Sequence, residues 1–186
     1  MFWGFEMDGG GFVPDIVTLG KPLANGLALG AVVCRREVAA AFASSGMEYF
    51  NTFAANHVSC VASLTTLRVL AEERLAHNAA VVGAELMGLL RLLQASSEGA
   101  LIGSVRGRGL MVGIELVSDR VSKIAAGAAA AFVVRHMRCE SAVLCGTDGP
   151  AHNVIKVKPP LPWTLDDALT FVTALRRALL AWSEAC

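Results

Sequence analysis

Lys21 is the residue whose type and setting point most directly to chemistry. It follows a short apolar run that contains Ile16, Val17 and Leu19, and it precedes Pro22. Proline cannot donate a ladder hydrogen bond and favours extended backbone before it, so we expect a strand to stop here with Lys21 at its end. A lysine whose pKa is lowered by apolar walls can act as an amine nucleophile or Schiff-base lysine. The residues alone also allow a solvated lysine beside a turn.

Two further side chains could bind anions. Thr52 precedes an expected helix, where a hydroxyl and free backbone N–H groups favour an anion, although such a threonine can simply start the helix. Arg106 stands among glycines in the run from Gly103 to Gly109. Its guanidinium can offer a bidentate fork to a carboxylate or phosphate, although R-G-R-G can also be only a tight turn.

Composition excludes several classes of protein. The chain of 186 residues has 16 basic and 16 acidic side chains, so it lacks the basic stripe of a nucleic-acid surface. The longest run without a polar side chain, Ile124 to Val134, is shorter than the roughly 18 residues of a membrane span. The five cysteines are widely spaced, without a C-x-x-C pair, which indicates thiols in a reducing compartment rather than disulfides or a metal site.

Hydrophobic periodicity predicts strands alternating with helices. The run Ala28 to Cys34 is continuously apolar, as in buried parallel strands. A glycine-punctuated strand pair is expected over Val105 to Leu116, and short strands over Ala142 to Cys145 and Asn153 to Val157. Helices are expected over Arg36–Phe42, Asn56–Glu72, Glu73–Gln94, Ala125–Arg138 and Thr164–Trp182, the last with Thr164 as N-cap. This order predicts the α/β class, with residues 1–72 in one lobe and 73–186 in a smaller α+β lobe.

The run D-I-V-T-L-G-K-P-L-A-N-G, from Asp15 to Gly26, resembles the cofactor-lysine segment of the class III aminotransferases. These enzymes use pyridoxal 5'-phosphate on the type I fold of PLP-dependent transferases, and the resemblance continues along nearly the whole chain. It implies that residues 1–72 are the C-terminal part of the large PLP-binding domain. Residues 73–186 would then form the small C-terminal domain.

The resemblance also implies roles for the candidate residues. Lys21 would form the Schiff base with pyridoxal 5'-phosphate and then move the proton at the carbon next to nitrogen. Thr52 would reach across a homodimer to the cofactor phosphate of the partner subunit. Arg106 would hold the carboxylate of a small amine or amino-acid substrate. The family usually has glycines and a proline where this chain has Ala54, Ala55 and His57.

Two stretches resemble one branch of the family in particular. Met47 to Phe53, and Gly146 to Pro160, are similar to the alanine-glyoxylate aminotransferase 2-like branch, which includes phospho-lyases acting on ethanolamine phosphate or phosphohydroxylysine. In that branch phosphate is expelled from the carbon next to the activated one, instead of the amine being transferred. Both transamination and phosphate elimination therefore remain open for this chain.

The resemblance begins in the middle of the family's fold. The family's acid that pairs with the pyridine nitrogen, its glycine-rich phosphate cup and its ring-stacking aromatic residue all lie upstream of the segment that resembles Phe2 to Phe5. We therefore expect a C-terminal portion of a longer enzyme. The alternative is a truncated, non-catalytic product that retains the dimer surface. The expected location is intracellular, in the cytoplasm or the mitochondrial matrix.

Overall fold

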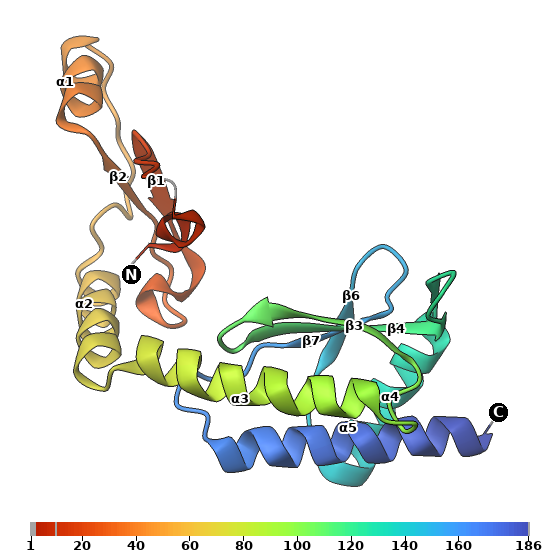
Figure 1. Ribbon diagram of the computed structural model, residues 1–186. Helices are drawn as coiled ribbons and strands as arrows, with labels where there is room; N and C mark the ends of the chain where they lie inside the picture. Colours follow the sequence, from red (N-terminus) through yellow and green to blue (C-terminus); the bar gives the residue numbers. More distant parts are fainter. Residues whose placement is uncertain (1–2, 10, 186) are drawn as a thin grey trace. The chain divides into compact units, whose positions relative to one another are not determined.

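The computed structural model describes residues 3–9 and 11–185. The chain divides into two compact units, Met1–Glu73 and Arg74–Cys186. Both units are drawn in Figure 1. Mixed helix and sheet in this order confirms the predicted α/β class.

The first unit combines short helices with one two-stranded sheet. Strands β1 (Ile16–Leu19) and β2 (Ala31–Cys34) pair antiparallel, with Ile16 opposite Cys34. The short helix η2 (Lys21–Ala24) lies between them in sequence and packs against α2 (His57–Glu72). The unit also contains η1 (Gly4–Asp8) and α1 (Arg36–Ser44). The side chain of Asn56 accepts a hydrogen bond from the Ser59 N–H and caps α2, close to the predicted start of that helix.

Little of the first unit is buried. Among its described residues only Ala24, Ser59 and Ser63 are buried. The prediction of a buried parallel strand over Ala28–Cys34 was wrong, because β2 begins at Ala31, runs antiparallel to β1 and is mostly exposed. Its apolar sequence suits a strand covered on both faces, but the described residues of this unit do not provide that cover.

The second unit contains an antiparallel sheet. Its strands are β3 (Ile102–Arg108), β4 (Met111–Asp119), β7 (Val154–Val157) and β6 (Gly146–Asp148), in that spatial order, and β5 (Ile124–Ala125) pairs with β4. The expected strand pair around Val105–Leu116 is confirmed. The expected strand at Ala142–Cys145 was wrong, because Ala142 takes a left-handed conformation that ends α4, and the strand starts at Gly146.

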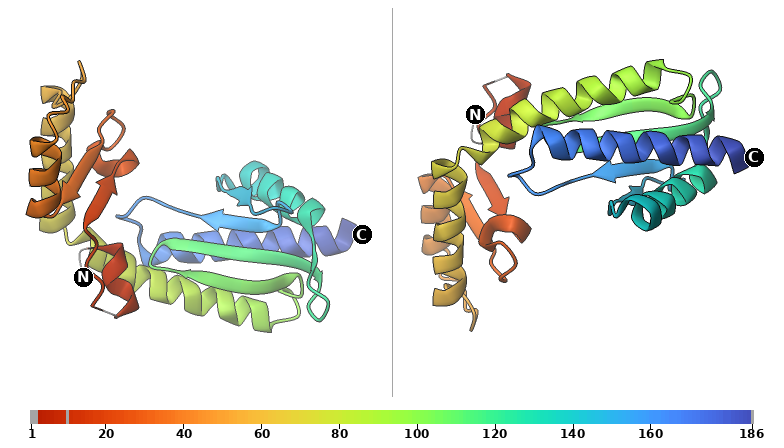
Figure 2. Two further views of the ribbon diagram at one scale, coloured as in Figure 1. Left: turned by 90° about the horizontal axis from the view of Figure 1, so that it is seen from above. Right: turned by 90° about the horizontal axis from the view of Figure 1, so that it is seen from below.

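Three helices cover one face of this sheet. They are α3 (Leu75–Ala95), α4 (Gly127–Ser141) and α5 (Leu165–Ala185), and both views in Figure 2 show α3 and α5 side by side. Alternate residues of β4 point into the core against these helices, among them Val112, Ile114 and Leu116. None of the described helices of this unit lies on the opposite face, which presents Arg106, Glu115 and Lys156.

A reciprocal cap starts α5. The Asp167 N–H donates to the Thr164 hydroxyl at 3.2 Å, and the Thr164 N–H donates to the Asp167 carboxylate at 2.8 Å. This capping box confirms Thr164 as the predicted N-cap. The hydrogen bonds hold the pKa of Asp167 below its ordinary value.

Candidate functional site

Lys21 opens the short helix η2, directly after β1. Its backbone has φ 47°, so the extended conformation expected before Pro22 was wrong. Hydrogen bonds from the Leu23 N–H to the Gly20 carbonyl at 3.3 Å, and from the Asn25 N–H to the Pro22 carbonyl at 3.0 Å, tighten the chain into a 3-10 turn instead. A left-handed backbone outside glycine costs on the order of 1–3 kcal/mol, and such residues concentrate at functional sites.

The side chain of Lys21 lies at the surface of the first unit. The residue is exposed, as in the solvated alternative that the sequence also allows. Its helix η2 is nevertheless held on the side that packs against α2, where Ala24 is buried. The backbone at Lys21 is therefore positioned, while its side chain is accessible to a ligand.

Thr52 lies in an exposed turn shortly before α2. The Asn51 side chain accepts a hydrogen bond from the Phe53 N–H at 2.9 Å, and the Asn51 carbonyl accepts one from Ala54 at 3.0 Å. The helix itself is capped by Asn56, so Thr52 is not the N-cap. Its hydroxyl makes no hydrogen bond with the rest of the described chain, which leaves it available to a ligand.

Arg106 is held on the helix-free face of the second sheet. Its Nη1 donates to Glu115 Oε2 at 2.8 Å and to Ser104 Oγ at 2.6 Å, and the Ser104 hydroxyl donates to the same carboxylate at 3.0 Å. These bonds, chiefly the one from Arg106, lower the pKa of Glu115. These contacts use only one nitrogen of the Arg106 guanidinium. An anion that binds to Arg106 would nevertheless compete with Glu115 for its positive charge.

A second cation shares the face with Arg106. The strand register places Arg106 opposite Gly113, and Gly113 opposite Lys156, so the two cations stand in one row with a glycine between them. Two strand spacings separate their backbones, roughly 10 Å. Lys156 binds Asp148 at 2.7 Å and lowers the pKa of that carboxyl. Sequence reasoning did not select Lys156 by itself, although its alternation with Val157 and Lys158 along a strand was a usable signal.

The candidate residues are divided between the units. Lys21 and Thr52 belong to the first unit, and Arg106 belongs to the second. The described part of the chain contains no group of three or more His, Cys, Asp or Glu residues that could hold a metal ion. None of the described helices is long and apolar enough to cross a membrane.

The fold matches solved PLP-dependent enzymes of the type I fold. A phospholyase from Arthrobacter in complex with phosphoethanolamine superposes with a TM-score of 0.86 at 37% identity, covering 96% of this chain and 41% of that protein. An amine transaminase from an uncultivated Pseudomonas species, in its PLP-bound form, gives a TM-score of 0.81 at 31% identity, over 94% of this chain and 40% of that protein. The fold is thus that of a PLP-dependent transferase.

The sequence defines the family. The family Aminotransferase class-III matches residues 1–179, and the chain belongs to this family of PLP-dependent enzymes. The Drosophila melanogaster protein named alanine–glyoxylate aminotransferase 2-like is 43% identical over 97% of this chain and 36% of its own length. The Caenorhabditis elegans ethanolamine-phosphate phospho-lyase homolog 1 is 38% identical over 96% of this chain and 38% of its own length. The chain therefore spans little more than a third of these relatives.

Proposed function

We propose that this chain supplies the cofactor lysine and part of the substrate site of a PLP-dependent transaminase or phospho-lyase that acts on a small amine. The observation that carries the proposal is the setting of Lys21. It combines the G-K-P sequence at the end of β1 with a left-handed backbone, held by a helix that packs on α2. An exposed amine on a positioned backbone is suited to attack an aldehyde.

The donor groups of the chain fit the cofactor. A primary amine at Lys21 matches the aldehyde, and a hydroxyl at Thr52 matches the phosphate; both are exposed and accessible. The bound cofactor supplies the electron sink for cleavage next to the amine nitrogen. Lys21 would hold the cofactor through Nζ and would then carry the proton at the substrate carbon next to nitrogen. Arg106 would bind the carboxylate or phosphate of the substrate.

The two units would have different parts in this site. Residues 1–72 would be the C-terminal part of the large PLP-binding domain, and residues 73–186 the small domain. The enzyme would be a homodimer in which Thr52 binds the cofactor phosphate of the partner subunit. The apolar residues Val58, Val61 and Leu64 of α2 are more than half exposed, at 66%, 63% and 55%. A second copy, and further chain such as the longer relatives have, would cover this surface.

The names of the relatives support a proposal for the substrate class. One solved relative is a complex with phosphoethanolamine, and the curated relatives include both aminotransferase and phospho-lyase names. We propose a small primary amine, either an amino acid or an amine that carries phosphate. Two relatives, from Arabidopsis thaliana and Homo sapiens, are named as mitochondrial. The proposed location is accordingly the mitochondrial matrix or the cytoplasm.

A non-catalytic chain that retains the dimer surface is the second candidate. The exposure of Lys21 within the first unit favours it, because a nucleophilic lysine is usually set among apolar side chains. A titration of the purified chain with pyridoxal 5'-phosphate separates the two candidates, with Lys21→Arg as the test variant and Lys123→Arg as its control. A covalent visible absorption band that saturates in wild type and Lys123→Arg but is lost in Lys21→Arg supports the cofactor role. Equal bands in all three proteins would favour the non-catalytic candidate.

A further inference from the structure

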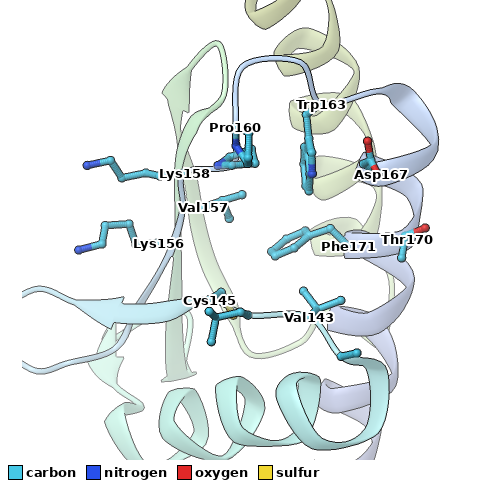
Figure 3. Close-up of a pocket in the computed structure, with 13 residues that line it drawn as sticks. Val143, Cys145, Lys156, Val157, Lys158, Pro160, Trp163, Asp167, Thr170 and Phe171 are labelled. Atoms are coloured by element: carbon cyan, nitrogen blue, oxygen red, sulfur yellow. The ribbon is translucent and has the colours of Figure 1, made fainter. Parts of the chain in front are cut away.

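Two further cations stand on the helix-free face of the second sheet. Arg108 lies two residues after Arg106 in β3, so the alternation of side chains along a strand puts both on this face. Lys158 directly follows β7 and lies two residues after Lys156. Figure 3 shows both ammonium groups on the side of β7 away from Trp163. The face therefore carries two arginines from one strand and two lysines from another.

The strand register brings Arg108 and Lys158 to either side of Met111. Arg108 is paired with Met111 in the β3–β4 ladder, and the β4–β7 ladder has Val112 opposite Val157. One further step in the same register places Lys158 beside Met111. The backbones of the two cations are then two strand spacings apart, roughly 10 Å, and both residues have long, flexible side chains. Met111 is 63% exposed, so the surface between the two cations is open to a ligand.

The charges of Arg108 and Lys158 are not compensated by a neighbouring acid. The other arginine and the other lysine of this face are each bound by a carboxylate, at 2.8 and 2.7 Å. Neither Arg108 nor Lys158 forms an ion pair with another described residue. The pKa of Asp148 is lowered first by its hydrogen bond from Lys156, and least by the charge of Lys158. The end of the face at Met111 consequently carries uncompensated positive charge.

We infer that Arg108 and Lys158 form a binding site for a phosphate group above Met111. An arginine fork and a lysine ammonium both bind phosphate oxygens, and a dianion is attracted more strongly than a carboxylate to a pair of cations. As a part of the substrate site, this role rests on the proposed function. The two residues would then determine whether an amine that carries phosphate is preferred over an amino acid.

A titration of the full chain with inorganic phosphate, at pH 8 and constant ionic strength, tests the inference. The chain contains six methionines, whose methyl groups can be labelled with carbon-13 and followed by NMR, and Met111→Leu identifies the signal of Met111. We expect phosphate to shift this signal in a saturable way. Acetate, which carries a single charge, should bind several-fold more weakly.

Variants that remove or keep the charge distinguish a site from general attraction to a basic protein. Arg108→Gln and Lys158→Gln should each weaken phosphate binding about threefold, as expected for the loss of one exposed charge pair. Lys158→Arg keeps the charge and should bind phosphate like wild type. Lys123→Gln removes a cation from the turn before β5 and should also bind like wild type. No saturable shift in wild type, equal binding of phosphate and acetate, or unchanged binding by Arg108→Gln and Lys158→Gln would each overturn the inference.

A failure of the proposed function gives a different result. That function fails if pyridoxal 5'-phosphate does not label Lys21, which is measured separately from the phosphate titration. Saturable phosphate binding without this label would support the phosphate site and contradict the cofactor role. Labelling of Lys21 in a chain that does not bind phosphate would support the cofactor role and overturn the inference.

Discussion

Two glycines of α3 should respond in opposite directions to the same substitution. A Cβ built on Gly83 would lie 2.3 Å from both the carbonyl carbon and the oxygen of Gly109. Gly109 belongs to the β3–β4 turn and has φ +53°, so it is a backbone neighbour that cannot rotate away. A Cβ on Gly88, in the same helix, meets nothing within 4 Å. Only Gly83 marks a close approach of helix to turn.

The expected magnitudes follow from these contacts. Replacing glycine by alanine inside a helix raises the free energy of unfolding by about 1 kcal/mol. Gly88→Ala should show this full increase. Forcing extra atoms into a packed site costs about 1–3 kcal/mol, and contact with backbone places Gly83→Ala at or above the upper end. After the propensity gain is subtracted, Gly83→Ala should destabilise the second unit by about 2 kcal/mol. The two variants should therefore differ by about 3 kcal/mol.

Urea unfolding measures this difference. Tryptophan emission reports on the second unit through Trp163 and Trp182, and small proteins lose about 1–3 kcal/mol of stability per molar urea. The midpoints of the two variants should consequently differ by on the order of 1–3 M. A Gly83→Ala protein at least as stable as wild type would show that α3 does not press on the β3–β4 turn.

Three further predictions concern local interactions. Thr164→Ala should destabilise the chain by about 1 kcal/mol in a urea titration, because the N-cap bond to Asp167 is lost; no change would contradict the capping box. Glu115→Gln should reduce the loss of unfolding free energy between pH 7 and pH 3, and an unchanged pH dependence would argue against its pairing with Arg106. Iodoacetamide should alkylate the exposed Cys139 well before Cys145, whose pKa is raised to about 11, as followed by peptide mass; equal rates would contradict the burial of Cys145.

The sign of the Glu115 prediction follows from proton binding. The pKa of Glu115 in the folded chain is lower than its ordinary value of 4.5, so the folded state binds its proton less readily than the unfolded state. The stabilisation is therefore complete above pH 4.5 and is lost as the pH falls through the folded pKa. Both side chains of the Glu115–Arg106 pair are partly exposed, at 33% and 56%, so solvent screening keeps the effect small.

Local signals in the sequence predicted each α-helix but not every end, because the helix expected over Ala125–Arg138 spans Gly127–Ser141 and Ala125 belongs to β5. Thr164 followed by Asp167 predicted the start of α5, and the apolar period after Asn56 predicted α2. Local signals failed where the backbone takes a left-handed turn. Ala142 has φ 54°, which delays strand β6 to Gly146, and nothing in an alanine predicts that conformation. The sequence did not predict the exposure of β2 either, because an apolar run does not show which residues cover the strand.

The candidate site likewise has features that local sequence predicted and features that it did not. Glycine or proline neighbours selected Lys21 and Arg106, and the position before an expected helix selected Thr52. The pairing of Arg106 with Glu115 depends on strand register, which the sequence alone does not define. The same register placed Lys156 across Gly113 from Arg106. Motifs and hydrophobic periodicity therefore could not predict contacts that depend on the pairing of strands distant in sequence.

The most direct test of the central claim is to locate the cofactor on the chain. Pyridoxal 5'-phosphate would be added to the purified protein, the adduct reduced with borohydride and its position found by peptide mass, with Lys21→Ala as control. The chain has four lysines, Lys21, Lys123, Lys156 and Lys158. Our account predicts an adduct confined to Lys21 and absent from the variant. Labelling spread over the other three lysines, or no labelling at all, would contradict it.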